Sequence, residues 1–197
     1  ALNRLRRDFG ADIKIDGVKN SLIINNSRLP SLVAAHWQQF IADVETLPLL
    51  HQIQLIQLEI DSLKFLQVHN TVRELVLYAC RGIRNFSLVN TLQFLELLDL
   101  SSCLFGIHQS NGVAWRFEQL HDLRLLNCER LASAELASIL KNCPNLKKLA
   151  VSAHSIDTNV VGLLSNLKSF KKLTVDGGRG DVELPAQLLQ LRSLPFE

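Results

Sequence analysis

LELLDLSSC, residues 95–103, has apolar side chains at Leu95, Leu98 and Leu100 and ends in Cys103. The same spacing recurs in VRELVLYAC (residues 72–80) and in LHDLRLLNC (residues 120–128). Three copies that agree at four positions indicate an internal repeat, which is the sequence signature of a stacked architecture. The rest of the chain can therefore be searched for further copies in the same phase.

Three looser copies lie at residues 50–58, 146–154 and 170–178. The second apolar position of each copy gives six anchors, which are Ile53, Leu75, Leu98, Leu123, Leu149 and Leu173. Successive anchors are 22, 23, 25, 26 and 24 residues apart. Periods of this length are typical of solenoids in which each unit adds one strand and one helix or turn.

The middle of each copy predicts a short strand, because alternate apolar residues point to one side. Helical spacing of apolar residues predicts helices over 133–141 and 157–167, and Asp157 is a good N-cap. Strand followed by helix, repeated, predicts an α/β fold: a right-handed horseshoe with a parallel sheet on its concave face.

The segment Cys143-Pro-Asn-Leu-Lys-Lys-Leu149, within residues 136–164, resembles the cysteine-containing leucine-rich repeats of F-box proteins. The resemblance covers residues 50–178 and departs from the family in the irregular stretch 106–119. It implies protein recognition, often of substrates by ubiquitin ligases. An F-box itself is not visible, because only the Leu-Pro opening of one appears, at residues 29–30.

Residues 1–47 fall outside the repeat and are expected to form a separate segment. The sequence predicts a helix over 2–9, a hairpin of strands 11–16 and 21–26, and an amphipathic helix over 30–46. This order resembles the later half of a KH RNA-binding domain, although no Gly-x-x-Gly loop is present. The alternative is a cap that shields the first repeat. The expected organisation is 1–47 cap or KH-like fragment, 48–180 repeats, and 181–197 C-terminal cap or tail.

Composition narrows the class of protein further. Hydrophobic residues make up 47% and charged residues 20%, and the net charge is +2, which is too low for nucleic-acid binding by global charge alone. The chain contains no methionine and is expected to be a fragment. No apolar run is long enough to span a membrane. The four cysteines, free of any disulfide spacing, indicate a reducing compartment, and we expect cytoplasmic or nuclear localisation.

No catalytic, cofactor-binding or metal-binding constellation stands out. Cys80, Cys103 and Cys128 should form a buried ladder on adjacent turns, with His154 at the equivalent place one turn further on. One ligand per turn does not converge into the tetrahedron that zinc requires. The sequence therefore predicts a non-enzymatic protein without cofactor or small-molecule substrate.

Strand alternation predicts which side chains face outward on the concave surface. The expected partner-binding residues are Ile56, Glu74, Val76, Tyr78, Leu97, Asp99, Asp122, Arg124 and Leu126, and Ser101 and Ser152 are expected to be outward too. A contiguous apolar group on an exposed face indicates an interface, and Tyr78 is the best anchor in it.

A basic cluster gathers in the last repeats: Lys147, Lys148, Lys168, Lys171 and Lys172. These lysines are either a solvated face or a nucleic-acid patch. The sequence thus favours a protein–protein interaction module, such as an adaptor or substrate-recognition component. The alternative is an RNA-associated protein that combines a KH-like segment with the repeats. A membrane partner is not expected.

Overall fold

The computed structural model describes residues 1–9, 12–14, 20–25, 34–60, 62–83, 86–103 and 115–176. The expected C-terminal cap or tail at 181–197 and the last position of the sixth copy, Gly178, lie outside the described residues.

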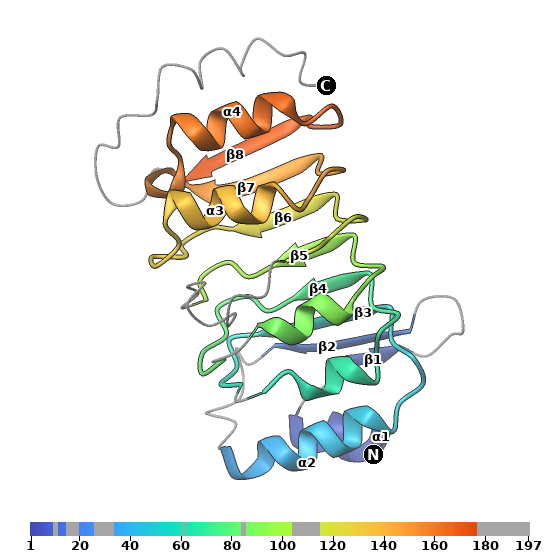
Figure 1. Cartoon of the computed structure of the whole chain (residues 1–197). Helices are drawn as coiled ribbons and strands as arrows, with labels where there is room; N and C mark the ends of the chain where they lie inside the picture. The colour runs from blue at the N-terminus through green and yellow to red at the C-terminus, as the bar shows by residue number, and fades with distance from the viewer. Residues whose placement is uncertain are drawn as a thin grey trace.

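The described strands form one open sheet in which the strand order follows the chain order (Figure 1). The strands are β1 (Asp12–Lys14), β2 (Ser21–Asn25), β3 (Gln52–Ile56), β4 (Glu74–Val76), β5 (Leu97–Asp99), β6 (Asp122–Leu125), β7 (Lys148–Ser152) and β8 (Lys172–Asp176). Strands β2 to β8 are parallel, and only β1 runs antiparallel to its neighbour. The chain is therefore an α/β protein built on a parallel sheet.

The register of the sheet confirms the phase of the repeat. Ile53 pairs with Leu75, which pairs with Leu98, and the series continues through Leu123 and Leu149. It ends where Leu149 pairs with the sixth anchor in β8. Each anchor lies directly beside the next, so the anchors predicted from spacing form one apolar row across six strands.

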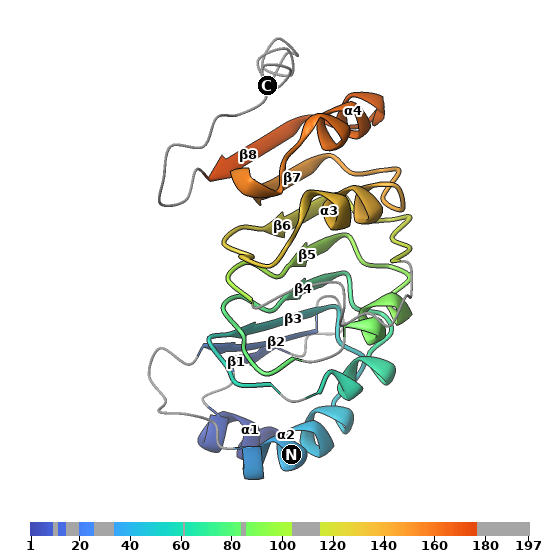
Figure 2. The same ribbon diagram turned by 60° about the vertical axis from the view of Figure 1, so that its left-hand side comes forward.

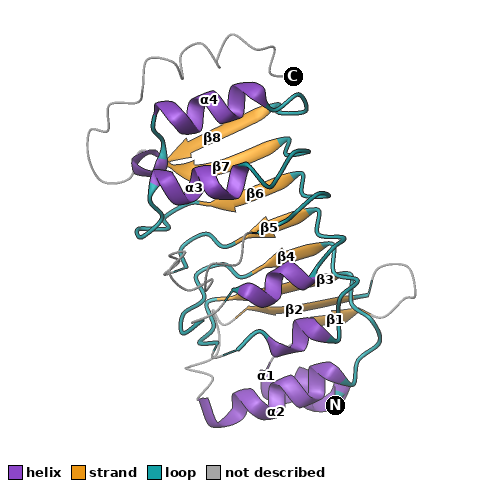
Figure 3. Cartoon of the chain, in the orientation of Figure 1, coloured by secondary structure: helices purple, strands orange, loops and turns teal. Residues whose placement is uncertain are grey.

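The N-terminal segment joins this sheet, which the sequence did not indicate. Its elements are α1 (Leu2–Phe9), β1, β2 and α2 (Ala34–Glu45), in the predicted order. The predicted hairpin forms, with Ile13 opposite Leu22. Strand β2 also pairs in parallel with β3, placing Leu22 beside Ile53 in phase with the anchors. The segment is thus continuous with the repeats in the sheet (Figure 3).

Helical segments connect the strands and follow one another along one side of the sheet (Figure 2). They are the 3-10 helices η2 (Lys64–Gln67) and η3 (Ser87–Thr91) and the α-helices α3 (Ser133–Leu140) and α4 (Thr158–Asn166). A further 3-10 helix, η5 (Ala153–Ser155), follows directly on the end of β7. The prediction of helices in the fourth and fifth connections is confirmed. Asp157 is the N-cap of α4, because its carboxylate accepts the N–H of Val160 at 2.8 Å.

The core between sheet and helices is mostly aliphatic, with an aromatic cluster at the N-terminal end and a further aromatic pair, Trp115 and Phe117, before β6. At the N-terminal end Trp37 stacks on Phe40 with ring centroids 4.5 Å apart, and Phe9 and Phe65 contact Phe40 edge-on. At the other end the core positions of β8, Leu173 and Val175, are only partly buried. The core residues near α1 and α2 are therefore more completely buried than those of β8.

One buried histidine ties α2 to the first repeat. His69 is fully buried, and its Nε2 lies 2.9 Å from the carbonyl oxygen of Val44. Its Nδ1 accepts the backbone N–H of Leu50 at 3.3 Å. Since a carbonyl can only accept, Nε2 carries the hydrogen and the ring is neutral. Burial lowers the pKa of His69, and the Val44 carbonyl partly offsets that shift.

A residue in the left-handed backbone conformation follows each of four successive strands, β3 to β6. Gln57, Ala79, Ser102 and Asn127 have φ angles of 57°, 53°, 59° and 55°. Each immediately precedes the ninth position of its copy, which is Leu58 in the first and a cysteine in the other three. Only glycine adopts this conformation at no steric cost, so the repeat imposes it on whichever residue stands there.

Candidate functional site

The sheet face opposite the helices offers the broadest patterned surface among the described residues. Side chains alternate along the strands, as in β3, where Ile53 and Leu55 are buried and Gln52, Gln54 and Ile56 are half-buried. We call the second set, with its equivalents on the other strands, the open sheet face. The predicted alternation of inward and outward residues is confirmed in β3, β4 and β6.

Register arranges the open sheet face in rows that cross the strands. One row runs from Glu74 through Leu97 and Asp122 to Lys148 and Lys172. Neighbours in a row are roughly 4.8 Å apart, the spacing of hydrogen-bonded strands. The residues that were expected to act together on β4 to β8 are therefore neighbours in space.

An apolar group occupies the middle of the open sheet face. Ile56, Val76, Leu97 and Leu126 are half-buried, and Tyr78 keeps 40% of its surface exposed. Tyr78 follows the end of β4, and its carbonyl oxygen accepts the N–H of Gln57 at 2.8 Å. The backbone of the expected anchor is thus fixed by the neighbouring repeat.

Three polar residues of this face are buried, contrary to expectation. Asp99 is only 8% exposed, because its Oδ1 accepts the N–H of Ser101 at 2.9 Å. Ser101 and Ser152 in turn accept the N–H groups of Leu126 and Asn127. These side chains stabilise the turns at the strand ends, so Asp99 has a local structural role that its predicted outward position did not indicate. The two-residue spacing of Asp99 and Ser101 is the signal that could have shown it.

The remaining charged residues on the middle strands are engaged with one another. Arg124 forms two hydrogen bonds to Asp122, at 3.1 and 2.9 Å, and these raise the pKa of Arg124. Gln52 donates to Glu74 at 2.6 Å. The polar side chains in the middle of the open sheet face are therefore bonded to one another, and its carboxylates outnumber its one arginine.

The lysines predicted to form a basic cluster do come together. Lys148 and Lys172 are direct neighbours in the register of β7 and β8. The residues before them are also adjacent, because the N–H of Lys171 donates to the carbonyl oxygen of Lys147 at 2.8 Å. Lys148, Lys168, Lys171 and Lys172 are exposed, and Lys147 is half-buried.

The cysteines are free and buried, as predicted. Each of three thiols donates to a carbonyl oxygen of the preceding strand or its end: Cys80 to Leu55 at 3.1 Å, Cys103 to Leu77 at 2.7 Å and Cys128 to Leu100 at 3.3 Å. Burial raises the pKa of Cys80, Cys128 and Cys143 to about 12, and it raises that of Cys103 as well. Thiols of this kind are poor nucleophiles and poor metal ligands.

The expectation that His154 continues this ladder is wrong. His154 is exposed within η5, whereas the ladder positions before it are buried. The fifth copy departs here because β7 runs on to Ser152 and leads directly into η5, so the left-handed turn of the earlier copies is absent. Among the described residues, no group of three or more His, Cys, Asp or Glu side chains is placed to hold a metal ion.

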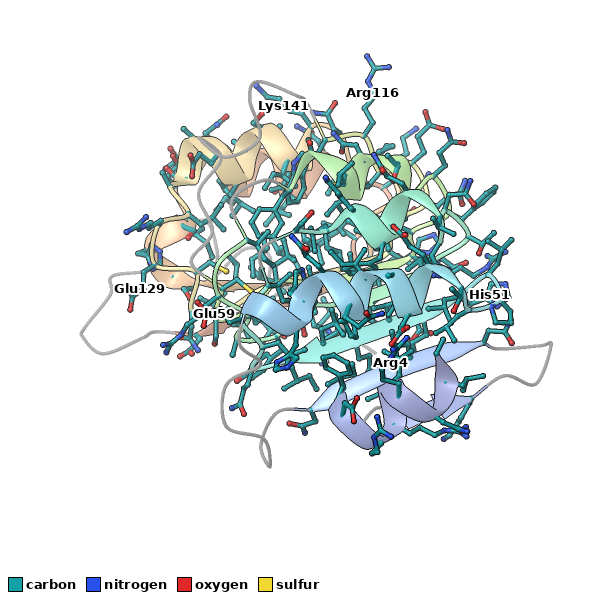
Figure 4. The ribbon with its side chains drawn as sticks, turned by 90° about the horizontal axis from the view of Figure 1, so that it is seen from below. Arg4, His51, Glu59, Arg116, Glu129 and Lys141 are labelled. Atoms are coloured by element: carbon teal, nitrogen blue, oxygen red, sulfur yellow. The ribbon has the colours of Figure 1, made fainter. Side chains whose placement is uncertain are left out.

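A shallow hollow of about 370 Å³ lies at the ends of β4 to β6, lined by Arg81, Ser102, Asn127 and Glu129. Figure 4 shows Glu129 at this edge of the sheet and Lys141 and Arg116 on the side that carries the helices. Sequence reasoning missed this hollow because two of its walls are the left-handed turn residues. It also missed three exposed apolar side chains outside the strands: Leu49, Val68 and Phe94.

No helix in the described part of the chain is both long enough and apolar enough to cross a membrane. A scan against protein-family models found no match for the chain. A search of the curated proteins found no similar sequence either. Inference about function therefore starts from the geometry of the open sheet face.

Proposed function

We propose that the chain is a leucine-rich-repeat solenoid of the cysteine-containing type, and that it works as a non-enzymatic protein-recognition module. The in-phase anchors and the repeated thiol-to-carbonyl hydrogen bonds support the first part. Such a module suits an adaptor or a substrate-recognition component of a larger complex, as the resemblance to F-box repeat proteins implies.

The observation that carries the proposal is the apolar group on the open sheet face. Ile56, Val76, Tyr78, Leu97 and Leu126 come from four consecutive repeats and converge on one surface. A sheet face turned to water normally carries polar side chains, so clustered apolar residues there favour an interface. Tyr78 supplies a large side chain with a polar tip, the type of residue that commonly dominates binding energy.

The test replaces the anchor and compares it with an aromatic residue outside the strands. Tyr78→Ala should weaken partner binding by about 2 kcal/mol, or about thirtyfold, without unfolding the protein. Phe94→Ala is the matched control, because Phe94 is 50% exposed and precedes β5 on a turn. Quantitative affinity purification from the native cells should show a set of proteins lost with Tyr78→Ala and kept with Phe94→Ala. If both variants retain the same proteins at the same levels, the proposal fails.

An RNA-associated function is the alternative, and the adjacency of the lysines in β7 and β8 is the observation that favours it. The N-terminal order of helix, strand, strand and helix fits a KH-like segment but equally fits a cap. Protein recognition should depend on Tyr78, whereas RNA binding should depend on the lysines. Substitution of Lys148 and Lys172, with acidic peptide and RNA as ligands, separates the two functions.

A further inference from the structure

The lysines of β7 and β8 lie in pairs that repel each other. Lys148 is opposite Lys172, and Lys147 is beside Lys171 through the backbone hydrogen bond described above. Facing residues on neighbouring strands are roughly 5 Å apart at their Cβ atoms. Like charges in this arrangement destabilise a sheet, so the fold alone gives no reason to place four lysines here.

Nothing among the described residues neutralises these lysines. No ion pair joins any of the five lysines to another described residue. The nearest acid in the row is Asp122, the register partner of Lys148. Its two carboxylate oxygens are already bound by Arg124. The positive charge of the cluster is therefore not paired within the described residues, and a group outside them can bind there.

The cationic end of the open sheet face is close to the apolar group. Leu97 lies two strands from Lys148 in the same row, at roughly 10 Å, and Val76 lies one strand further and two residues along it, at roughly 16 Å. An extended chain advances about 3.3 Å per residue, so three or four residues reach from Lys148 to a point between Leu97 and Val76. One short segment of a partner can contact both.

We propose that Lys148 and Lys172, with Lys147 and Lys171 beside them, bind an acidic segment of the partner protein. The carboxylates of that segment lie over β7 and β8, and an apolar side chain three or four residues away packs against Leu97 and Val76. This inference rests on the proposed function and adds the chemistry of the partner to it.

Two observations favour an acidic protein segment over nucleic acid. A phosphate backbone carries a charge at every nucleotide, so one that continued along the row would place charges over Asp122 and Glu74, whereas a peptide can confine its carboxylates to β7 and β8. Single-stranded nucleic acid also needs exposed aromatic side chains for stacking. Tyr78 lies four strands from Lys172 and four residues along the strand direction from its row, at roughly 23 Å. Phe170, on the turn before β8, is partly buried in the core.

The test measures binding of a fluorescein-labelled oligoglutamate peptide by anisotropy at low salt. Lys148→Glu combined with Lys172→Glu should weaken binding about tenfold or more, because two attractions become two repulsions. Arg116→Glu combined with Lys141→Glu is the control, since it changes the net charge equally on the helix-bearing side (Figure 4). The control should change affinity less than about twofold. Lys148→Gln with Lys172→Gln replaces the first variant if that variant does not fold.

Two results would overturn the inference. Equal losses in the two double variants would mean that only net charge matters. Binding of an oligouridylate of equal charge, tenfold tighter than oligoglutamate and dependent on the same lysines, would assign the cluster to nucleic acid. Failure of the proposed function is a separate result, because it appears as unchanged partner capture by Tyr78→Ala.

Discussion

Mild acid should destabilise this protein through His69. The ring is fully buried and neutral, with Nδ1 accepting from Leu50 and Nε2 bonded to Val44. Protonation would add a hydrogen to Nδ1, break the bond to Leu50 and bury a charge. The native state therefore takes up this proton only at a pH below the ordinary value of 6.5.

The sign and size of the effect follow from linkage. The unfolded chain protonates His69 near pH 6.5, whereas the folded pKa is lower. Stability from this group is thus fully present above pH 6.5, and it is lost as pH falls towards the folded pKa. Across that window the unfolded state binds one more proton, so the free energy of unfolding falls by about 1.4 kcal/mol per pH unit.

The assay is urea unfolding at several pH values between 7.5 and 5. His69→Gln removes the titrating group. Its free energy of unfolding should therefore fall less steeply with decreasing pH than that of the wild type, by about 1.4 kcal/mol per pH unit across the same window. His154→Gln is the control, because it makes the same substitution at an exposed histidine. The reasoning is refuted if His69→Gln keeps the wild-type slope. Observation by NMR that His69 in the native protein titrates near pH 6.5 would refute it independently.

Two further predictions concern the repeats themselves. The buried thiols of Cys80, Cys103 and Cys128 should react with a thiol reagent at pH 8 only after unfolding, because burial holds them in the protonated form; rapid reaction of the native protein would contradict their burial. Asp157→Ala should lower the free energy of unfolding by about 1 kcal/mol, since the N–H of Val160 loses its partner. Asp157→Asn, which can still accept that N–H, should lose much less, and equal losses from both variants would show that the cap bond is not responsible.

Spacing predicted the repeated strands because each anchor must enter the same core. Leu75 and Leu98 are fully buried side by side, so a shift of one residue in either strand would expose its apolar side chains. The helices at α3 and α4 were predicted for a similar reason, since one face of each is apolar. Local patterns of this kind are visible without knowing what lies next to them.

Features that depend on a neighbouring repeat were not visible in the same way. Strand β2 alternates like an isolated hairpin strand, and nothing local shows that its other edge pairs with β3. Asp99 was missed for another reason: strand alternation predicts an outward side chain, whereas its Oδ1 accepts the N–H of Ser101 in the same repeat. The left-handed residues Ser102 and Asn127 were missed because the sequence places no glycine there to mark the turn.

The core residues are more completely buried at the N-terminal end than at β8, and this difference determines where unfolding should begin. Each strand contacts only the strands before and after it, so stability is close to a sum of local terms, and cooperativity extends only as far as adjacent repeats are well matched. The stacked rings of Trp37 and Phe40 stabilise the N-terminal end, whereas Leu173 and Val175 of β8 are only partly buried. Within the described chain, opening should begin at β8 and progress towards β3. The lysine-bearing strands are then the first to lose order, and a partner that binds there would also brace the weakest end of the array.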